Sequence, residues 1–372
     1  SALRGGYKPI CADFFADKDL AAACPARRID LRHSSRHFAA VAESCSPSHW
    51  LYAGGFENRP ELVDRIARKH RLLGMDGETL RAIRDPIRVA RVLGQAGIPC
   101  PAVTLSARGL PRDGSWLKKR LNSGGGQGIE PLIDAAPARL GCRYLQQRVK
   151  GPSYSALYIG APRGASLVGV TRQLIGAPGS PFGYRGSIGP LATSAPLTAR
   201  LKALGSVLSS AFGLTGWFGV DYILNRGIPW PVEINPRYTA SVEVHELFLG
   251  RSLLSDHRRA CEGIDEDTDS SAISGETSRP VFGKLIIYAP RGVVVPECLR
   301  LRAQARDLFA VNSIADVPWP GTSIGVGEPL MTLLSNAATL EACRKRLFRL
   351  EQKWLRRLGI AADKPALGAS SG

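Results

Sequence analysis

The sequence predicts an α/β fold whose first and second halves differ in pattern. Up to about residue 100, expected strands alternate with expected helices, which is the order of a parallel α/β domain. From residue 115 onward, short strands follow one another between glycine turns, and a long apolar stripe marks a helix over 196–212. The 372 residues, 44% of them hydrophobic, suffice for two or three such domains.

Hydrophobic periodicity and turn residues place the individual elements. The expected strands are 8–15, 50–54, 116–119, 144–149, 154–159, 167–175, 217–224, 230–234 and 281–289. The other expected helices are 60–70, 85–95, 241–249, 253–262 and a basic one at 340–358. Ala2–Gly6 looks like the end of a helix, so we expect the first strand of the α/β domain to be missing. An acidic, Ser/Thr-rich stretch at 265–279 is expected to be a surface loop.

Composition narrows the classes of function. Lys and Arg number 49 against 32 Asp and Glu, a net charge of +17, so an acidic small substrate or a generally basic surface is expected. A nucleic-acid binder stays an alternative on charge alone, because no basic run or nucleic-acid motif is present. Eight scattered cysteines without a CxxC pair predict reduced thiols and no structural zinc. Without an apolar run of ~20 residues or a signal peptide, a cytoplasmic protein without membrane segments is expected.

A lysine-ended strand runs into a glycine-rich segment. Lys119 closes the strand, and Gly124, Gly125, Gly126 and Gly128 follow within nine residues; residues 124–128 are called the glycine loop. Glycines let backbone N–H groups approach an anion, so such a loop beside a lysine suits a polyphosphate. The segment is neither a Walker A loop nor a dinucleotide fingerprint, and a plain hairpin turn is the alternative.

A second segment joins two strands at 144–159. Its linker contains Gln146, Gln147, Arg148 and Val149, where an adenine could pair with exposed backbone groups. An ordinary edge strand is the alternative.

The third segment carries three oxygen-bearing side chains on two neighbouring strands. Asp221 lies among apolar residues, and Glu233 alternates with its apolar neighbours, so it faces away from them. Asn235 lies two residues further on, on the face of Glu233. These three residues, the oxygen trio, predict a Mg²⁺ site, because Mg²⁺ prefers carboxylate, water and phosphate oxygens. A solvated strand face with a capping Asn is the alternative.

Taken together in this order, the three segments resemble the ATP-grasp superfamily over roughly residues 85–240. The resemblance implies an ATP-grasp fold. It places a truncated Rossmann-like domain at 1–84, a small subdomain with the glycine loop at 85–165, and a C-terminal subdomain with the Mg²⁺ site and terminal helix at 166–372.

The resemblance also implies roles for residues. Lys119 would contact the α- and β-phosphates of ATP, the glycine loop would act as a lid, and the linker would lie beside adenine. The oxygen trio would bind Mg²⁺, with Mn²⁺ as a substitute, and Arg237 would lie near the transferred phosphoryl group. Two positions depart from the pattern: Pro86 replaces a common ATP-binding lysine, for which Arg84 or Arg88 could substitute, and Ser153 replaces a ribose-binding Glu.

Shorter motifs resemble the ATP-grasp proteins that make furan-type one-carbon carriers, including tyramine–glutamate ligase and the bacterial methylofuran proteins. These motifs lie at 54–57, 172–173, 182–186, 235–237, 282–284 and 315–322. The resemblance implies a carboxylate–amine ligase that works through an acyl phosphate and joins a glutamate-like acid to an amine, in a chain that could form a homo-oligomer. Glu57, Arg172, Tyr184 and Arg185 are the expected substrate residues.

Other readings stay open. A ligase of another substrate pair, such as a dipeptide or a carbamoyl-phosphate-like reaction, is one alternative, and a non-catalytic ATP-grasp scaffold is another. No general base is evident, although His245 or Glu246 could take the proton of the amine.

Overall fold

The computed structural model describes residues 1–133, 140–264, 279–297, 308–311 and 314–360. Its N-terminal elements are β1 (Cys11–Asp13), α1 (Lys18–Ala23), β2 (Ala26–Arg28), η1 (Leu31–His33), α2 (Ser34–Ser44), β3 (His49–Trp50), η2 (Phe56–Asn58), α3 (Pro60–Ala67) and β4 (Arg71–Leu72). β1 pairs in parallel with β2, and β3 pairs in parallel with β4. Parallel pairing is what the expected Rossmann-like domain requires, but here the strands are short and form two separate pairs.

The first residues match the expected helix end in their hydrogen bonds. Ala2–Gly6 is a series of turns in which Gly5 N donates to the Ser1 carbonyl at 2.9 Å and Tyr7 N to the Ala2 carbonyl at 3.0 Å, with Gly6 at a φ of 77°, as at the C-terminus of a helix. The strand expected at 8–15 covers only Cys11–Asp13.

A small antiparallel sheet follows the N-terminal part. α4 (Gly77–Ile83) and α5 (Pro86–Gln95) precede it, and its strands are β5 (Val103–Thr104), β6 (Trp116–Arg120), β7 (Glu130–Pro131) and β8 (Arg143–Gln147), in the order β5-β8-β6-β7. α5 begins at Pro86 because the Asp85 side chain accepts from the backbone N–H groups of Ile87 and Arg88.

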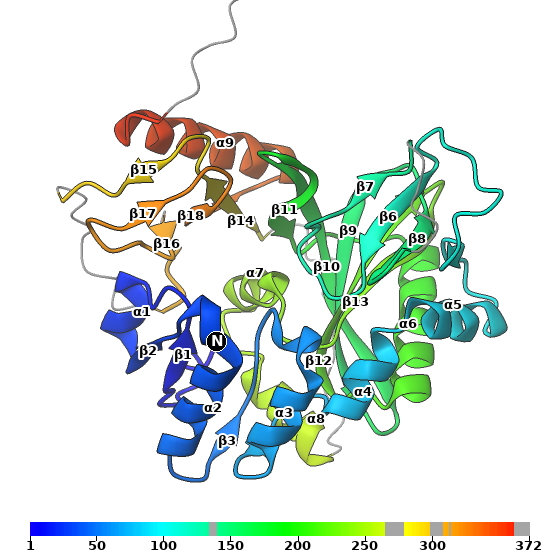
Figure 1. The fold of residues 1–372 in the computed structure, drawn as a ribbon, viewed down its shortest axis with the longest axis horizontal. Helices are drawn as coiled ribbons and strands as arrows, with labels where there is room; N and C mark the ends of the chain where they lie inside the picture. Colours follow the sequence, from blue (N-terminus) through cyan, green and yellow to red (C-terminus); the bar gives the residue numbers. More distant parts are fainter. Residues whose placement is uncertain (134–139, 265–278, 298–307, 312–313, 361–372) are drawn as a thin grey trace, which may run out of the picture.

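The other strands build an eight-stranded sheet. Its members are β9 (Ser153–Ala161), β10 (Gly164–Ala177), β11 (Ser180–Gly189), β12 (Gly216–Asn225), β13 (Ile228–Asn235), β14 (Val281–Tyr288), β16 (Ile314–Ala315) and β18 (Pro329–Ala337). Their order is β13-β12-β9-β10-β11-β14-β18-β16. The helices with this sheet are α6 (Ala195–Phe212), α7 (Ala240–Leu249), α8 (Leu254–Glu262) and α9 (Leu340–Arg357), and β15 (Val293–Val294) pairs with β17 (Ser323–Ile324) beside it. Figure 1 shows the small sheet lying over the β9–β13 side of the large one.

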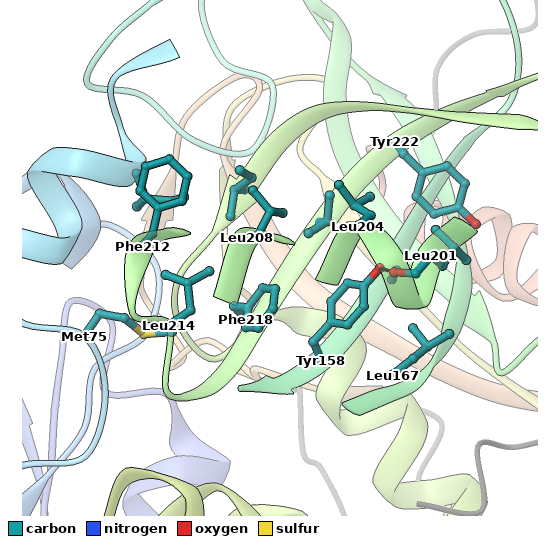
Figure 2. Close-up of a cluster of buried hydrophobic side chains, with 14 of the residues drawn as sticks. Met75, Tyr158, Leu167, Leu201, Leu204, Leu208, Phe212, Leu214, Phe218 and Tyr222 are labelled. Carbon is teal, nitrogen blue, oxygen red and sulfur yellow. Dashed lines mark hydrogen bonds between the residues drawn. The ribbon is translucent and has the colours of Figure 1, made fainter. Parts of the chain in front are cut away.

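The main core lies between α6 and the large sheet. Leu201, Leu204 and Leu208 recur at helical spacing on the buried face of α6, and they pack against Tyr158 and Phe218 (Figure 2). The Tyr158 hydroxyl donates to the Leu201 carbonyl at 2.9 Å, which satisfies the polar atom of a fully buried ring. This core fixes β9 and β12, and therefore the strand that carries Asp221.

Strand pairing indicates where one subdomain ends and the next begins. Residues 85–147 form the small sheet and the helix α5 that precedes it, whereas β9 pairs with β10 and β12 in the large sheet. The expected boundary at 165 falls at the start of β10. We propose placing it between Gln147 and Ser153, and keeping the expected boundary near 84, where α4 gives way to α5.

The described residues contain no helix that is both long and apolar enough to cross a membrane. The seven cysteines among them are free thiols, as expected, and Cys298 lies outside the described residues. Most of the acidic stretch expected at 265–279 also lies outside them.

Candidate active site

A main cleft of about 1040 Å³ lies between the small sheet and the large sheet. Most of the predicted site residues line it: Lys119, Gly125, Gly126, Gln146, Gln147, Arg148, Val149, Arg172, Tyr184, Arg185, Asp221, Glu233, Asn235 and Arg237. Three others, Gly124, Gly128 and Glu57, do not line it directly. The fold therefore gathers residues from 119 to 237 around one space.

The oxygen trio stands at the base of this cleft on β12 and β13. Asp221 pairs directly across the two strands with Glu233, and Gly219 pairs with Asn235, so the three side chains share a face. Asn235 Nδ2 donates to Asp221 Oδ2 at 3.2 Å. The trio therefore forms one cluster.

Burial sets the electrostatics of the trio. Desolvation, followed by the nearby charge of Glu233, raises the pKa of Asp221 to about 6, while hydrogen bonds from Ser155 and Gln173 lower it. Two carboxylates close together in a desolvated cleft repel each other, and a divalent cation would relieve that repulsion. The donor set thus fits Mg²⁺. No group of three His, Cys, Asp or Glu side chains could hold a metal ion in the described part of the chain, so a cation bound to Asp221 and Glu233 would take the Asn235 side chain as its third protein ligand.

Ser155 and Gln173 are positioning residues that sequence reasoning did not assign. Ser155 on β9 lies opposite Asp221 in the strand register. Gln173 Oε1 accepts from Ser153 Oγ at 2.6 Å, which leaves the amide nitrogen of Gln173 for Asp221. A polar residue recurring every second position in an otherwise apolar strand was the available signal.

The side chains of Lys119 and Gln146 both extend from the small sheet to the Val232 carbonyl on β13. Lys119 Nζ donates to Gln146 Oε1 at 3.1 Å and to the Val232 carbonyl at 3.0 Å, and Gln146 Nε2 donates to the same carbonyl at 3.4 Å. Both side chains come from neighbouring strands of the small sheet, with Lys119 paired to Tyr144. Both residues line the main cleft and also a smaller cavity of about 80 Å³. Lys119 is thus held where a phosphate in the cleft could reach it.

The glycine loop is docked on β11. Tyr184 N donates to the Gly125 carbonyl at 2.9 Å, and a Cβ on Gly126 would lie 1.9 Å from the Phe182 carbonyl oxygen. Gly126 also has a φ of +77°, so both its backbone conformation and its close approach require glycine. Gly128 has a φ of +68°, and a Cβ there would lie 3.1 Å from the Arg120 side chain.

The linker keeps only part of its backbone free. Gln147 N donates to the Ala102 carbonyl, and Arg148 N donates to the Ser115 carbonyl, both at 2.8 Å. The Arg148 guanidinium lies over the Phe182 ring at 5.6 Å. An adenine would therefore have to use the carbonyl groups of the linker or the N–H of Val149.

A buried carboxylate from the N-terminal part holds Arg237. Arg237 Nε donates to Glu57 Oε1 at 2.9 Å, and Gly55 N donates to Glu57 Oε2 at 2.6 Å. Only 1% of the Glu57 side chain is exposed. Arg237 Nη2 in turn donates to Asn235 Oδ1 at 3.1 Å. Glu57 thus orients Arg237 and, through it, the oxygen trio; it does not face the open cleft.

The structure distinguishes between the two arginines considered as substitutes for the missing lysine. Arg84 lies 3.6 Å from Glu233 and donates to the carbonyls of Leu121 and Ser123, just before the glycine loop. Arg88 is exposed and stacks over Phe212 at 5.5 Å. Arg84 is therefore the one of the two that lies beside the oxygen trio and the glycine loop.

The three other expected substrate residues, Arg172, Tyr184 and Arg185, line the main cleft. Arg172 stacks on Tyr154 at 4.9 Å, and the Tyr184 hydroxyl hydrogen-bonds Ser187 Oγ at 2.9 Å. Burial raises the pKa of Tyr184 to about 12, so it remains a neutral donor. Arg185 is ion-paired with Glu351 of α9. Within the described residues, the contact given for the Arg172 guanidinium is its stacking on Tyr154.

His245 and Glu246 are absent from the cleft lining. His245 is fully buried, and desolvation lowers its pKa to about 3. Glu246 accepts from Leu253 N at 2.9 Å and from Arg4 Nη1 at 3.2 Å, which ties α7 to the first residues. Neither residue is placed to take a proton from a substrate in the cleft.

The comparisons with known proteins bear on the fold. A family model described as an ATP-grasp domain matches residues 83–241, which include the small sheet, strands β9 to β13 of the large sheet and the oxygen trio. This part of the chain is therefore similar to an ATP-grasp domain. A comparison with curated proteins gave no match.

Solved structures share the fold of this ATP-grasp domain and its flanking regions. The L-amino acid ligase from Bacillus licheniformis has a TM-score of 0.66 at 14% identity, covering 93% of this chain and 91% of that one. The N5-carboxyaminoimidazole ribonucleotide synthetase from Thermotoga maritima has a TM-score of 0.60 at 13% identity, covering 96% and 94%. The biotin carboxylase domain of the Hydrogenobacter thermophilus 2-oxoglutarate carboxylase, determined with MgADP and bicarbonate, has a TM-score of 0.66 at 14% identity, covering 91% and 83%. The expected ATP-grasp fold is confirmed.

Proposed function

We propose that this chain is an ATP-dependent carboxylate–amine ligase. The observation that carries the proposal is the oxygen trio facing Lys119 and the glycine loop across one cleft. Hydrogen-bond donors for phosphate groups lie on one wall, and oxygen ligands for a cation lie on the other. A nucleoside triphosphate with its metal ion requires both. Structural neighbours named as ligases, such as the L-amino acid ligase, support the reaction class.

The proposed reaction has two steps. A carboxylate oxygen of the acid attacks the γ-phosphorus of ATP, the bond to the β-phosphate oxygen breaks, and ADP and an acyl phosphate form. The amine nitrogen then attacks the acyl carbon, phosphate leaves with the C–O electron pair, and the nitrogen loses a proton to give the amide. Asp221, Glu233 and Asn235 would hold Mg²⁺, which neutralises charge on the β- and γ-phosphates when it is bound.

The residues of the chain would bind, orient and exclude water. Lys119 and Arg84 would donate to phosphate oxygens, because both lie beside the glycine loop and the trio. Arg237, held by Glu57, would stabilise charge on the transferred phosphoryl group. The glycine loop, docked on Tyr184, would keep water from hydrolysing the acyl phosphate.

For the substrates we propose a glutamate-like acid and an amine, as in the furan-type carriers. The support is the motif resemblance of residues 54–57 and 182–186, together with Arg172, because a guanidinium recognises a carboxylate through two parallel hydrogen bonds.

The test is ADP release with ATP, Mg²⁺ and glutamate, screened against tyrosine, tyramine and related amines. Asp221→Asn or Glu233→Gln should fold, because each removes a repelling charge, and should abolish release. Glu61→Gln, an exposed carboxylate on α3, is the matched control and should behave as wild type. Lys119→Ala should raise the ATP requirement more than the amine requirement. Magnesium-dependent ATP binding without ADP release for any amine would favour a scaffold protein instead.

A further inference from the structure

Arg84 stands between two helices, at a position that fixes its backbone. It ends α4, where its N–H donates to the Leu80 carbonyl at 3.1 Å, and the next residue, Asp85, caps the start of α5. Leu80 and Ile83 bury the inner face of α4 in the main core. The two helices therefore fix the backbone of Arg84, and the contacts of its guanidinium decide where the side chain points.

The guanidinium of Arg84 uses only part of its donor capacity on the protein. Nη2 donates to Asn58 Oδ1 at 2.9 Å and to the carbonyls of Leu121 and Ser123, both at 2.7 Å. Nη1 lies 3.6 Å from Glu233 Oε1, which is longer than a hydrogen bond. Nε is buried and has no hydrogen-bond partner among the described residues. Arg84 therefore keeps donor groups that a ligand would satisfy.

Arg84 lines the small cavity of about 80 Å³. Lys119, Gly124, Gly126 and Glu233 line it as well, and three of these four also line the main cleft, so the two spaces share part of their walls. Arg84 and Lys119 thus bring two positive charges to a space between a carboxylate of the oxygen trio and the glycine loop. Such a space suits the terminal phosphate of a nucleoside triphosphate.

Asn58 reaches Arg84 from the N-terminal elements. It is the last residue of η2, the single turn that follows Gly55, and its N–H donates to the Gly55 carbonyl at 3.3 Å. Phe56 in the same turn stacks on Tyr52, with the ring centroids 5.8 Å apart. The Tyr52 ring belongs to the main core. Aromatic packing therefore anchors the turn that presents the Asn58 side chain.

Two consecutive residues of η2 each hold an arginine beside the oxygen trio. Glu57 accepts from Arg237 Nε at 2.9 Å, and this arginine donates in turn to one member of the trio. Asn58 accepts from Arg84, which lies 3.6 Å from another member, Glu233. One turn of the N-terminal part therefore sets the positions of two guanidinium groups around the proposed metal site.

We propose that Asn58 is a positioning residue that directs Arg84 to the terminal phosphate of ATP. This inference rests on the proposed ligase function, which places ATP in the main cleft. Asn58 and the carbonyls before the glycine loop accept from the same nitrogen, so they fix the guanidinium and leave Nε and Nη1 for the phosphate. Without Asn58, the carboxylate of Glu233, 3.6 Å away, would draw the guanidinium toward itself and away from the phosphate.

The experiment measures binding of two magnesium nucleotides to the full chain by isothermal titration calorimetry. One is ADP, and the other is AMP-PNP, an ATP analogue that is not hydrolysed. Asn58→Ala should weaken binding of AMP-PNP about tenfold, because the hydrogen bond that holds the charged Arg84 is lost. Binding of ADP, which lacks the terminal phosphate, should stay near wild type. Asn58→Asp retains the acceptor oxygen and should keep most of the affinity for AMP-PNP, which separates positioning from misfolding.

Glu61→Gln is the matched control. Glu61 accepts from Arg81 Nη2 at 3.1 Å, so it also links α3 to α4, one turn before Arg84, but neither partner lines the main cleft. This variant should bind both nucleotides as wild type does. The double variant Asn58→Ala/Arg84→Gln should bind AMP-PNP no more weakly than Arg84→Gln alone, because Asn58 acts through Arg84.

Four results would overturn the proposal: no binding of AMP-PNP by wild type, equal weakening of both nucleotides in Asn58→Ala, equal weakening in Glu61→Gln, or additive losses in the double variant. Nucleotide binding needs no turnover, so its result is distinct from that of the ligase test. ADP release by wild type, with equal effects of Asn58→Ala on both nucleotides, would overturn the positioning role alone. A selective loss of AMP-PNP binding in a chain that releases no ADP would support the positioning role and count against the ligase.

Discussion

Gly126→Ala tests whether docking of the glycine loop on β11 is required. The new Cβ would lie 1.9 Å from the Phe182 carbonyl oxygen, whereas ordinary contact begins at 3.4 Å, so the loop must move by 3.4 − 1.9 = 1.5 Å. The neighbouring Gly125→Ala is the matched control: its φ is also positive, at +61°, but no atom lies within 4 Å of the new Cβ. Both variants incur a conformational cost of about 1 kcal/mol. Only Gly126→Ala adds the displacement.

Hydrogen exchange at the Tyr184 amide reports docking directly, because that N–H donates to the Gly125 carbonyl. Losing a hydrogen bond worth about 1 kcal/mol would speed exchange about fivefold in Gly126→Ala and leave Gly125→Ala near wild type. ADP release in the absence of amine should rise relative to amide formation in Gly126→Ala, since a displaced loop admits water to the acyl phosphate. Equal exchange and equal partitioning in the two variants would refute the reasoning.

Three further predictions concern the surroundings of the site. Glu57→Gln should lower stability by about 2 kcal/mol in urea unfolding and reduce ADP release, because Arg237 loses the charge that holds it. Burial lowers the pKa of His257 to about 4, below its unfolded value of 6.5, so stability present above pH 6.5 should be lost as pH falls toward 4, by about 3 kcal/mol from this group. Gly205→Ala should destabilise by about 1–3 kcal/mol, despite the better helix propensity of Ala, because its Cβ would lie 2.4 Å from the Tyr158 ring.

Each of these has a control within the chain. Glu57→Gln is compared with Glu61→Gln on the exposed side of α3, and an equal effect would contradict the pairing with Arg237. His257→Gln should flatten the acid slope of unfolding free energy; an unchanged slope would remove His257 as its source. Gly94→Ala in α5 has open space around the new Cβ and should stabilise by about 0.5–1 kcal/mol, so a gain at Gly205 as well would refute the overpacking argument.

Hydrophobic spacing and capping residues predicted many of the helices and strands. α6 was predictable because Leu197, Leu201 and Leu204 repeat at helical spacing, and the start of α5 followed from Asp85 and Pro86. Strands such as β11 and β18 went unassigned, because their glycines and polar residues give no clear alternation, and they form through pairing with β14.

The local order of residues was enough to determine the oxygen trio as a group. Glu233 and Asn235 lie two residues apart on one strand face whatever surrounds them, and the apolar strand around Asp221 marks it as unusual. These relations follow from backbone geometry within a few residues, so a single sequence contains them.

Only the tertiary structure decided how distant segments meet. The contact between Glu57 and Arg237 joins residues 180 positions apart. Arg84, at the end of α4, lies 3.6 Å from Glu233, whereas Arg88 on α5 stacks over Phe212. The ion pair of Arg185 with Glu351 joins β11 to α9. Such meetings depend on how helices and sheets pack against one another, and packing is a property of the whole folded chain, which no local spacing encodes.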